Sequence, residues 1–399
     1  MKNYTNVIVL GILLAAASIY FIVTKVNFND VLLSMGYYEN KITILNTGDL
    51  HGHLNYNNLN GEYFSLDESH LEMGMALVKG TADEIKKKNK ETLFLDSGDM
   101  FHGTNEANVN KAEGIVEAVN LMGYDAMVPG NHEFNWGFER AMEINSQLNF
   151  PMLSANIFKD GKPAFDQYKT FHVGGKKIGV FGLTTRQFLQ NMQIYGTQGI
   201  TYEDPVKSAK TVIQELKKQK VDAIILISHL GDDADKEEII KNVDGIDLVL
   251  SGHGHHVYEK ADKVNHTYVA EAGSYSAYLG VAQMYFKNNG VAKITWRVTQ
   301  SKDRSKEDKA IAEVAGKYHA IAMENGKEII GRSTVDLDGI RTHVRTRETN
   351  LANLITDAMR EQGEADITLF NGGGIRESVP KGDISLYTIA KPLPFVNSL

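Results

Sequence analysis

The sequence predicts an α/β protein in which a larger layered domain is followed by a smaller second domain. Short apolar runs that end in polar residues alternate with helical segments from residue 41 onward, which is typical of strands and helices stacked in layers. After Ser274 the pattern changes to alternating apolar and polar residues, and a charged helical segment then separates two parts of the chain. The length of 399 residues is enough for two domains.

We expect four segments along the chain. They are a signal-anchor or signal peptide over residues 1–27, the larger domain over residues 40–301, a linker helix over residues 302–326, and the smaller domain over residues 327–399. The last segment has roughly 70 residues, which is small for a domain. We therefore expect it to be the truncated first part of a longer α/β domain.

The amino terminus favours a location outside the cytoplasm. The run Val7–Val23 is apolar and free of charges, with Lys2 before it and Lys25 after it. Its length is near the lower limit for a membrane-spanning helix, and the small residues from Ala15 could serve a signal peptidase. We expect an uncleaved signal-anchor, with a cleaved signal peptide as the alternative. In both cases the rest of the chain would be extracytoplasmic, either anchored at the cell surface or secreted.

The composition argues against nucleic-acid binding and excludes any site that needs cysteine. The net charge of −8 argues against binding to a nucleic-acid polymer, because such binding needs a basic surface that neutralises phosphates. It does not exclude small phosphorylated substrates, since a metal ion can supply positive charge locally. The absence of cysteine excludes disulfides and thiolate metal sites.

The strands and helices can be placed in order from apolar patterning and from breaker residues. We expect strands at residues 42–45, 92–95, 152–156, 177–183, 221–227, 246–250 and 366–370. We expect helices at residues 73–90, 112–122, 205–219 and 350–361. A hairpin turned by Asn288–Gly290 would close the larger domain.

Five turns that follow predicted strands carry the residue types that bind metal ions. The candidates are Asp49, His51, Asp99, Asn131, His132, His229, His253 and His255. Each of them taken alone would be an ordinary turn or packing residue, but ligand sites gather at the carboxyl ends of strands in such folds. We therefore expect one shared site.

The chemistry of these residues indicates the kind of ion. Imidazole nitrogen and carboxylate oxygen without sulfur suit Zn, Mn, Fe or Co. The set is too large for one tetrahedral ion, but it fits two divalent ions that share a carboxylate. The i, i+2 spacing suggests that Asp49 and His51 grip one ion together, and that His253 and His255 do the same.

Five motifs occur in the order seen in calcineurin-like metallophosphoesterases. They are Gly48–His53, Ser97–Thr104, Gly130–Phe134, Ser228–Gly231 and Ser251–His255. More narrowly, the chain resembles the 5′-nucleotidase, UDP-sugar hydrolase and 2′,3′-cyclic phosphodiesterase family. This resemblance covers about residues 42–395 and implies the metallophosphoesterase fold, a two-sheet β-sandwich flanked by helices.

The resemblance also implies a role for each candidate ligand. One metal ion would be held by Asp49, His51, Asp99 and His255. The other would be held by Asp99, Asn131, His229 and His253, so that Asp99 bridges the two ions. Phosphate would then be released by attack of a metal-bound hydroxide on phosphorus.

By the same resemblance His132 would not be a ligand. It would face the phosphate and act as an acid toward the leaving oxygen. Many relatives have Asp at the position of Asn135, and the amide found here matches the cyclic-phosphodiesterase branch. The neutral amide of Asn135 would stabilise a protonated His132 ring less than a carboxylate would. This weakens the expected role of His132 as an acid.

The second segment resembles the substrate-binding domain of this family. The glycine turn Asn371–Arg376 lets the backbone approach a ligand, and arginine offers a planar fork to anionic groups. The resemblance places Arg345, Asn371 and Arg376 on the substrate, and Phe395 against the base.

The sequence therefore predicts an extracytoplasmic phosphohydrolase with two divalent metal ions that removes phosphate from nucleotides. The main alternative is a 2′,3′-cyclic-nucleotide 2′-phosphodiesterase/3′-nucleotidase with the same chemistry. A non-catalytic surface-binding protein and a thiosulfate-ester hydrolase are further alternatives. The expected partners are a nucleotide or other small phosphate ester, and a membrane if the amino-terminal segment is uncleaved.

Overall fold

The computed structural model describes residues 27–55, 73–192, 195–288 and 290–394. The predicted amino-terminal signal segment and Phe395 lie outside the described residues. Within the described part of the chain, no helix is both long and apolar enough to cross a membrane.

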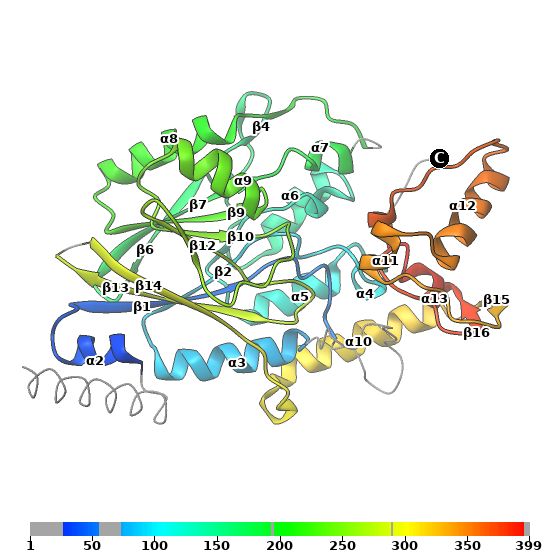
Figure 1. Ribbon diagram of the computed structural model, residues 1–399, viewed down its shortest axis with the longest axis horizontal. Helices are drawn as coiled ribbons and strands as arrows, with labels where there is room; N and C mark the ends of the chain where they lie inside the picture. Colours follow the sequence, from blue (N-terminus) through cyan, green and yellow to red (C-terminus); the bar gives the residue numbers. More distant parts are fainter. Residues whose placement is uncertain (1–26, 56–72, 193–194, 289, 395–399) are drawn as a thin grey trace, which may run out of the picture.

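Two β-sheets that pack face to face form the larger part of the molecule (Figure 1). The first sheet has the strand order β14-β13-β1-β2-β3, and the second has the order β11-β12-β10-β9-β7-β6. The first consists of β1 (Asn40–Thr47), β2 (Thr92–Asp96), β3 (Ala126–Met127), β13 (Leu279–Lys287) and β14 (Gly290–Thr299). The second consists of β6 (Tyr168–Val173), β7 (Lys176–Thr184), β9 (Ala223–His229), β10 (Leu248–Ser251), β11 (Asp262–Val264) and β12 (Thr267–Glu271). The predicted two-sheet α/β architecture is confirmed.

The centre of each sheet is parallel. Strands β1, β2 and β3 pair in parallel in the first sheet, as do β7, β9, β10 and β12 in the second. The antiparallel hairpin of β13 and β14 lies at the edge of the first sheet, beside β1, as the turn at residues 288–290 predicted. Because parallel strands end on the same side of a sheet, the loops after β1, β2, β3, β9 and β10 meet there.

Alternating side chains fill the space between the sheets. Ile42 and Ile44 of β1 are fully buried there, opposite Ile225 and Ile227 of β9. The residue between the first two, Thr43, points the other way, as the period of a strand requires. This shared apolar layer fixes the two sheets against each other and so sets the relative position of their loops.

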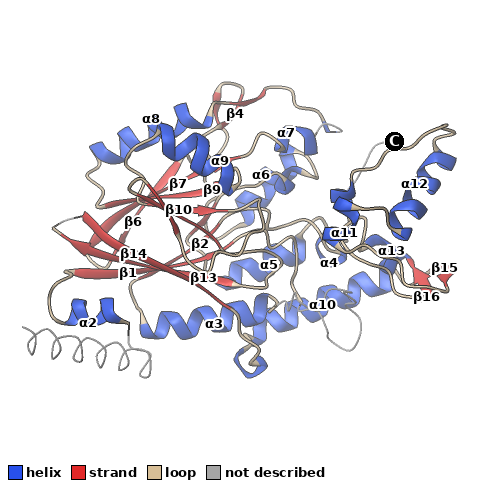
Figure 2. Ribbon diagram, viewed as in Figure 1, coloured by secondary structure: helices blue, strands red, loops and turns tan. Residues whose placement is uncertain are grey.

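Helices cover both outer faces of the sandwich (Figure 2). The first sheet is covered by α3 (Met75–Lys88), α5 (Glu113–Met122), α6 (Phe138–Gln147) and α10 (Lys309–Asn325). The second is covered by α8 (Pro205–Lys218) and η3 (Asp235–Ile240). The shorter elements are α2 (Phe28–Ser34), α4 (Asn105–Asn108), η1 (His132–Phe134), β4 (Ile157–Lys159), β5 (Lys162–Pro163), α7 (Phe188–Asn191), β8 (Ile200–Tyr202), α9 (Asp232–Ala234) and η4 (Arg304–Lys306).

The expected linker helix is shorter than predicted and is part of the larger body. It begins at Lys309 rather than residue 302, because the side chain of Asp308 caps it by accepting a hydrogen bond from the Ile311 amide. Its buried side chains, which include Tyr318, pack against α3 and α5, and the Tyr318 ring lies against Gly114. A Cβ at Gly114 would lie 2.4 Å from that ring, so the close packing requires glycine.

The second body lies at the far end of α10 (Figure 1). It consists of β15 (Ile329–Ser333), α11 (Arg341–Thr346), α12 (Asn350–Gln362), η5 (Gly372–Gly374), β16 (Gly382–Ser385) and α13 (Leu386–Ala390). Its small core is formed by Leu337, Val344, Leu351, Ile355, Ile375 and Val379.

Two predicted strands are absent from the described residues. Residues 366–370 pair with no other strand, and their apolar side chains Ile367 and Leu369 are 79% and 90% exposed. Residues 152–156 make only single bridges, from Met152 to Met127 and from Leu153 to Asp166. Apolar patterning identified both runs, but a strand also needs a partner of matching length.

Candidate metal centre

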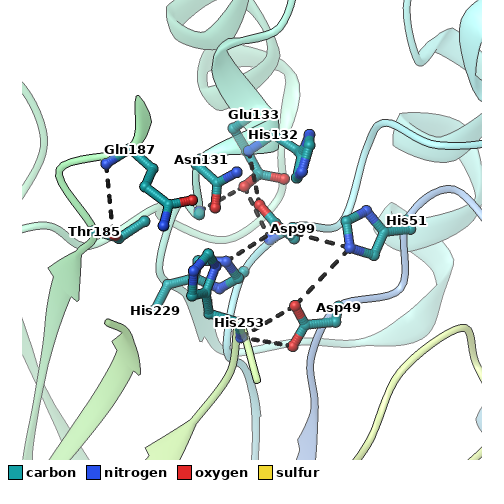
Figure 3. Close-up of polar contacts among 12 residues, drawn as sticks. Asp49, His51, Asp99, Asn131, His132, Glu133, Thr185, Gln187, His229 and His253 are labelled. Atoms are coloured by element: carbon teal, nitrogen blue, oxygen red, sulfur yellow. Dashed lines mark hydrogen bonds and ion pairs between the residues drawn. The ribbon is translucent and has the colours of Figure 1, made fainter. Parts of the chain in front are cut away.

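The carboxyl ends of β1, β2, β3, β9 and β10 and the loops after them bring all seven predicted ligands into one cluster, of which Figure 3 labels every residue except His255. The cluster consists of Asp49, His51, Asp99, Asn131, His229, His253 and His255. Five of them are at most 3% exposed, and the two carboxylates among these are 0% and 2% exposed. A group this polar is costly to bury unless its members compensate one another or bind a ligand.

Left-handed turns aim these side chains at one another. Five of the seven residues have positive φ angles: 51° at Asp49, 48° at His51, 55° at Asp99, 76° at His253 and 62° at His255. A residue other than glycine in this left-handed conformation costs of order 1–3 kcal/mol in backbone strain. Residues strained in this way cluster at functional sites. The i, i+2 argument from strand pleating was therefore the wrong reason for the convergence, because these residues are not extended.

One group of donors consists of Asp49, His51 and His255. The Nε2 atoms of the two imidazoles are 3.2 Å apart. Oδ1 of Asp49 lies 3.4 Å from Nε2 of His255 and 4.0 Å from Nε2 of His51. The Nδ1 atom of His51 is 3.0 Å from the carbonyl oxygen of His102, which fixes the ring with Nε2 toward the cluster.

The second group consists of Asp99, His229 and His253. Oδ2 of Asp99 is 3.1 Å from Nε2 of His229 and 3.7 Å from Nε2 of His51, so this carboxylate lies between the two groups. The backbone amide of His253 donates to both oxygens of Asp49, which joins the groups a second time. His253 and His255 belong to different groups, whereas their spacing alone suggested that they grip one ion together.

One buried ligand atom in this cluster, Oδ1 of Asn131, has no hydrogen-bond partner among the described residues. Nε2 of His229 is also buried, and it lies 3.1 Å from Oδ2 of Asp99. An orphaned buried polar atom costs about 1–3 kcal/mol, whereas both atoms are ordinary ligands of a divalent ion. Glycine at position 130 keeps the space beside them open, since a Cβ there would lie 2.2 Å from Oδ1 of Asp99 and 2.7 Å from Nε2 of His229. The residues present therefore fit a metal centre.

The electrostatics agree with this fit. Burial lowers the pKa of His253 to about 4 and also holds the pKa values of His51 and His255 well below the usual range. These imidazoles are thus neutral, the form that binds metal. Burial raises the pKa of Asp49 well above its usual value, because the charged carboxylate is costly to bury. Positive charge placed beside that carboxylate would offset this cost. Against the effect of burial, the neighbouring Asp99 carboxylate raises the pKa of His229 to about 10, so this imidazole is protonated without an ion, and a bound ion would displace that proton.

Glu133 holds together the loops that follow β2 and β3. Its buried carboxylate accepts hydrogen bonds from the amides of Gly130, Asp99, Met100 and Phe101, at 2.5 to 3.3 Å. This residue had no role among the sequence-based predictions. The only available signal was a carboxylate inside the motif Gly130–Phe134, and its partners 32 to 34 residues away could not be read from spacing.

His132 lies beside the cluster, and Asn135 orients its ring. Its Nδ1 atom is 3.1 Å from Oδ1 of Asn135, and that oxygen also accepts a hydrogen bond from the side chain of Asn191 at 3.1 Å. The Asn191 amide donates to the Asn131 carbonyl as well, at 2.9 Å. Asn191 was not predicted, and it links the His132 pair to a predicted ligand.

Arginines of the second body reach toward the cluster. Nη1 of Arg341 is 3.5 Å from Nδ1 of His255. The charge of Arg376 adds to burial in lowering the pKa values of His51 and His132, and burial together with Arg341 and Arg376 lowers the pKa of Arg345. The sequence did not single out Arg341, although it precedes Arg345 by one helical turn in α11.

The other predicted substrate residue that the structure describes has a local partner. The Asn371 side chain accepts a hydrogen bond from the Gly373 amide, which caps the glycine turn η5. Phe395 lies outside the described residues.

Comparison with known proteins agrees with the fold. Residues 42–257 match the family model for calcineurin-like phosphoesterases, and residues 329–399 match that for the 5′-nucleotidase C-terminal domain. A 5′-nucleotidase of Vibrio cholerae is 32% identical over 90% of this chain and 72% of its own length. The trifunctional nucleotide phosphoesterase YfkN of Bacillus subtilis is 30% identical over 90% of this chain, which spans only 26% of that protein.

A solved structure is similar over the same region. The 5′-nucleotidase precursor of Thermus thermophilus superposes with a TM-score of 0.76 at 28% identity, covering 89% of this chain and 74% of that one. The two-sheet fold and the buried histidine and aspartate cluster define a metallophosphoesterase, a hydrolase of phosphoric esters. With its second segment matched as well, the chain belongs to the 5′-nucleotidase family.

Proposed function

We propose that this cluster binds two divalent metal ions and hydrolyses nucleotides. Asp49, His51, Asp99 and His255 hold one ion, and Asp99, Asn131, His229 and His253 hold the other. The observation that carries this proposal is that one Asp99 oxygen lies beside His229 of one group and His51 of the other, in a cluster that also contains the buried, unpartnered Oδ1 atom of Asn131. Zn, Mn, Fe or Co suits the donor set. Such ions, when bound, lower the pKa of water and stabilise negative charge at phosphorus.

The protein's own residues position the substrate and the proton. His132 lies at the rim of the cluster, with its ring centroid 5.1 Å from that of His51. Because Oδ1 of Asn135 accepts hydrogen bonds, Nδ1 of His132 is the protonated nitrogen, and Nε2 is the nitrogen that would contact the phosphate or the leaving oxygen. We propose that His132 contacts the leaving oxygen and that Asn135 holds the His132 ring in place.

The nucleotide lies between the two bodies in this proposal. Arg341, Arg345 and Arg376 supply positive charge opposite the metal cluster, as an anionic substrate requires. Arg345, Asn371, Arg376 and Phe395 are the proposed substrate contacts, with Phe395 stacking on the base. Replacing Phe395 by Ala should then raise the KM for AMP and leave turnover of p-nitrophenyl phosphate unchanged. Equal loss on both substrates would refute the stacking role.

We place the active domain outside the cytoplasm. The support is the uncharged apolar run Val7–Val23 between Lys2 and Lys25. Cell fractionation, together with sequencing of the mature amino terminus, separates an anchored from a cleaved form. Activity found only in the cytosolic fraction would contradict this location.

The second candidate function is hydrolysis of 2′,3′-cyclic nucleotides by the same centre. The specific observation in its favour is Asn135, a neutral amide behind His132 at a position where a carboxylate would favour the imidazolium. Phosphate release from AMP and turnover of 2′,3′-cyclic AMP, measured side by side with added Mn²⁺, decide between the two. Faster turnover of AMP supports the nucleotidase, and faster turnover of the cyclic ester supports the alternative.

A further inference from the structure

A second cluster of possible ligands lies next to the loop that carries His253 and His255. Three donor atoms converge there: Oδ1 of Asp232 in α9, Nδ1 of His256 and Oε2 of Glu271 at the end of β12. None of these residues belongs to the centre described above. His256 directly follows His255, so this cluster and the catalytic ligands share one short loop.

The spacing of the donors suits a metal ion. Nδ1 of His256 is 3.0 Å from Oδ1 of Asp232 and 3.8 Å from Oε2 of Glu271, and all three donor atoms lie within 4.8 Å of one another. Bonds of about 2.0–2.2 Å from Zn²⁺ to nitrogen and oxygen require neighbouring donors about 3–4 Å apart. The observed distances fall in or near this range.

An independent observation points to a ligand at this place. The Glu271 side chain is 1% exposed, and its Oε2 atom has no hydrogen-bond partner among the described residues. The other oxygen, Oε1, accepts a hydrogen bond from the His256 amide and so fixes the carboxylate with Oε2 toward the cluster. A buried carboxylate oxygen without a partner is costly, and a cation would compensate it.

Glycine at position 254 leaves room for the three donors. A Cβ on Gly254 would lie 2.9 Å from Nδ1 of His256, 3.0 Å from Oε2 of Glu271 and 3.1 Å from Oδ1 of Asp232. Any larger residue would press against all three atoms at once. The loop therefore keeps open the space on which the donors converge.

The positive charge of the neighbouring Lys236 does not pair with the Asp232 oxygen that faces the cluster. Lys236 lies 3.5 Å from Oδ2 of Asp232, not from the oxygen that faces the cluster, and it pairs with Asp262 at 2.8 Å. The Tyr258 hydroxyl donates to the same Oδ2 atom at 2.5 Å. These contacts occupy the outer oxygen of Asp232 and leave Oδ1 turned inward.

We propose that Asp232, His256 and Glu271 bind a third divalent transition-metal ion. Two carboxylates and one imidazole form a borderline donor set that suits Zn²⁺ or Mn²⁺. The 58% exposed side chain of His256 gives the ion access from solvent. The ion would tie the loop that carries His253 and His255 to α9 and β12, and so stabilise that loop.

Metal stoichiometry tests this proposal. The full chain, stripped of metal, is dialysed against a series of free Zn²⁺ concentrations, and the bound metal is measured by mass spectrometry. We expect three ions per chain for the wild type at saturation, and two for Glu271→Gln. As a matched control, Asp262→Asn removes a nearby carboxylate that does not face the cluster, and it should keep three ions.

Additional variants keep the test decisive. A Glu271→Gln variant that still binds two ions must be folded, so loss of the third ion reports on the site itself. If that variant does not fold, His256→Ala, which changes an exposed side chain, is used in its place. Asp99→Ala should lose the catalytic ions and keep the third, which separates failure of this proposal from failure of the proposed function. A wild type that saturates at two ions, or variants that keep the wild-type number, would overturn the third site.

Discussion

Oδ1 of Asn135 lies 3.1 Å from Nδ1 of His132 and at the same distance from the side-chain nitrogen of Asn191. The single oxygen thus orients the imidazole and is itself held by a residue more than fifty positions along the chain. Since Asn191 also donates to the Asn131 carbonyl, the arrangement connects the orientation of His132 to a proposed metal ligand.

Replacing His132 by Ala should lower kcat for AMP by about 10²–10⁴-fold, which is the usual contribution of a positioned acid or base. The metal content should stay at the wild-type value. This second measurement is needed because His132 also lies within 4.8 Å of donor atoms of His51 and Asp99. Loss of an ion from the variant would make His132 a ligand and contradict the assigned role.

Replacing Asn191 by Ala should lower kcat about tenfold, because a loosely held imidazole spends less time in the productive geometry. The KM for AMP should remain unchanged, since Asn191 is not placed on the substrate. Asn120→Ala is a matched control, as the side chain of Asn120 bonds to the Gln147 carbonyl and the Asn149 amide, and neither belongs to the metal cluster. A variant whose KM rises while kcat is preserved would show that Asn191 does not position His132.

The sequence predicted the positions of the metal-type residues but not how they are held. Asp49, His51 and Asp99 could be recognised because each follows an apolar run that ends in a turn. Their left-handed backbone could not, because nothing local in the sequence marks a positive φ at Asp or His. The four amides bound by Glu133 and the approach of Arg341 to His255 arise from tertiary packing between segments far apart in the chain. Residues 366–370 have the apolar pattern of a strand but pair with no other strand in the described structure.

Glu133→Gln should destabilise the fold by about 3 kcal/mol, because hydrogen bonds to a charged acceptor contribute about 1.5–3 kcal/mol each and a Gln NH₂ would face two amide donors. Urea unfolding measures this change, and Glu139→Gln on the exposed surface of α6 is the control. Metal affinity should fall as well, since Glu133 binds the Asp99 amide. Equal stability of the two variants would show that the carboxylate is not what holds these loops.

A pH-dependent stability difference is expected at Asp235. Burial raises the pKa of Asp235 to about 7, although the hydroxyls of Ser228 and Ser251 each donate to it at 2.6 Å. Between its unfolded pKa near 3.9 and about 7, the folded state holds a proton that the unfolded state has lost, so this carboxyl lowers stability as pH rises. The slope is at most about 1.4 kcal/mol per pH unit.

Asp235→Asn removes this slope. The free energy of unfolding of the variant minus that of the wild type, measured in urea at fixed metal concentration, should increase from pH 5 to pH 7 and then level off. Taking the difference cancels the other titrating groups. A difference that stays flat, or that falls with pH, would show that Asp235 does not titrate in this way.

The central claim is that residues from five separate loops hold the ions at which nucleotides are hydrolysed. Its most direct test is phosphate release from AMP by the purified chain before chelation, after chelation and after Mn²⁺ is returned, with Asp99→Ala in parallel. We predict that chelation abolishes release, that Mn²⁺ restores it, and that the Asp99 variant stays inactive under all three conditions. Release that persists in chelator, or an Asp99 variant as active as the wild type, would contradict the claim.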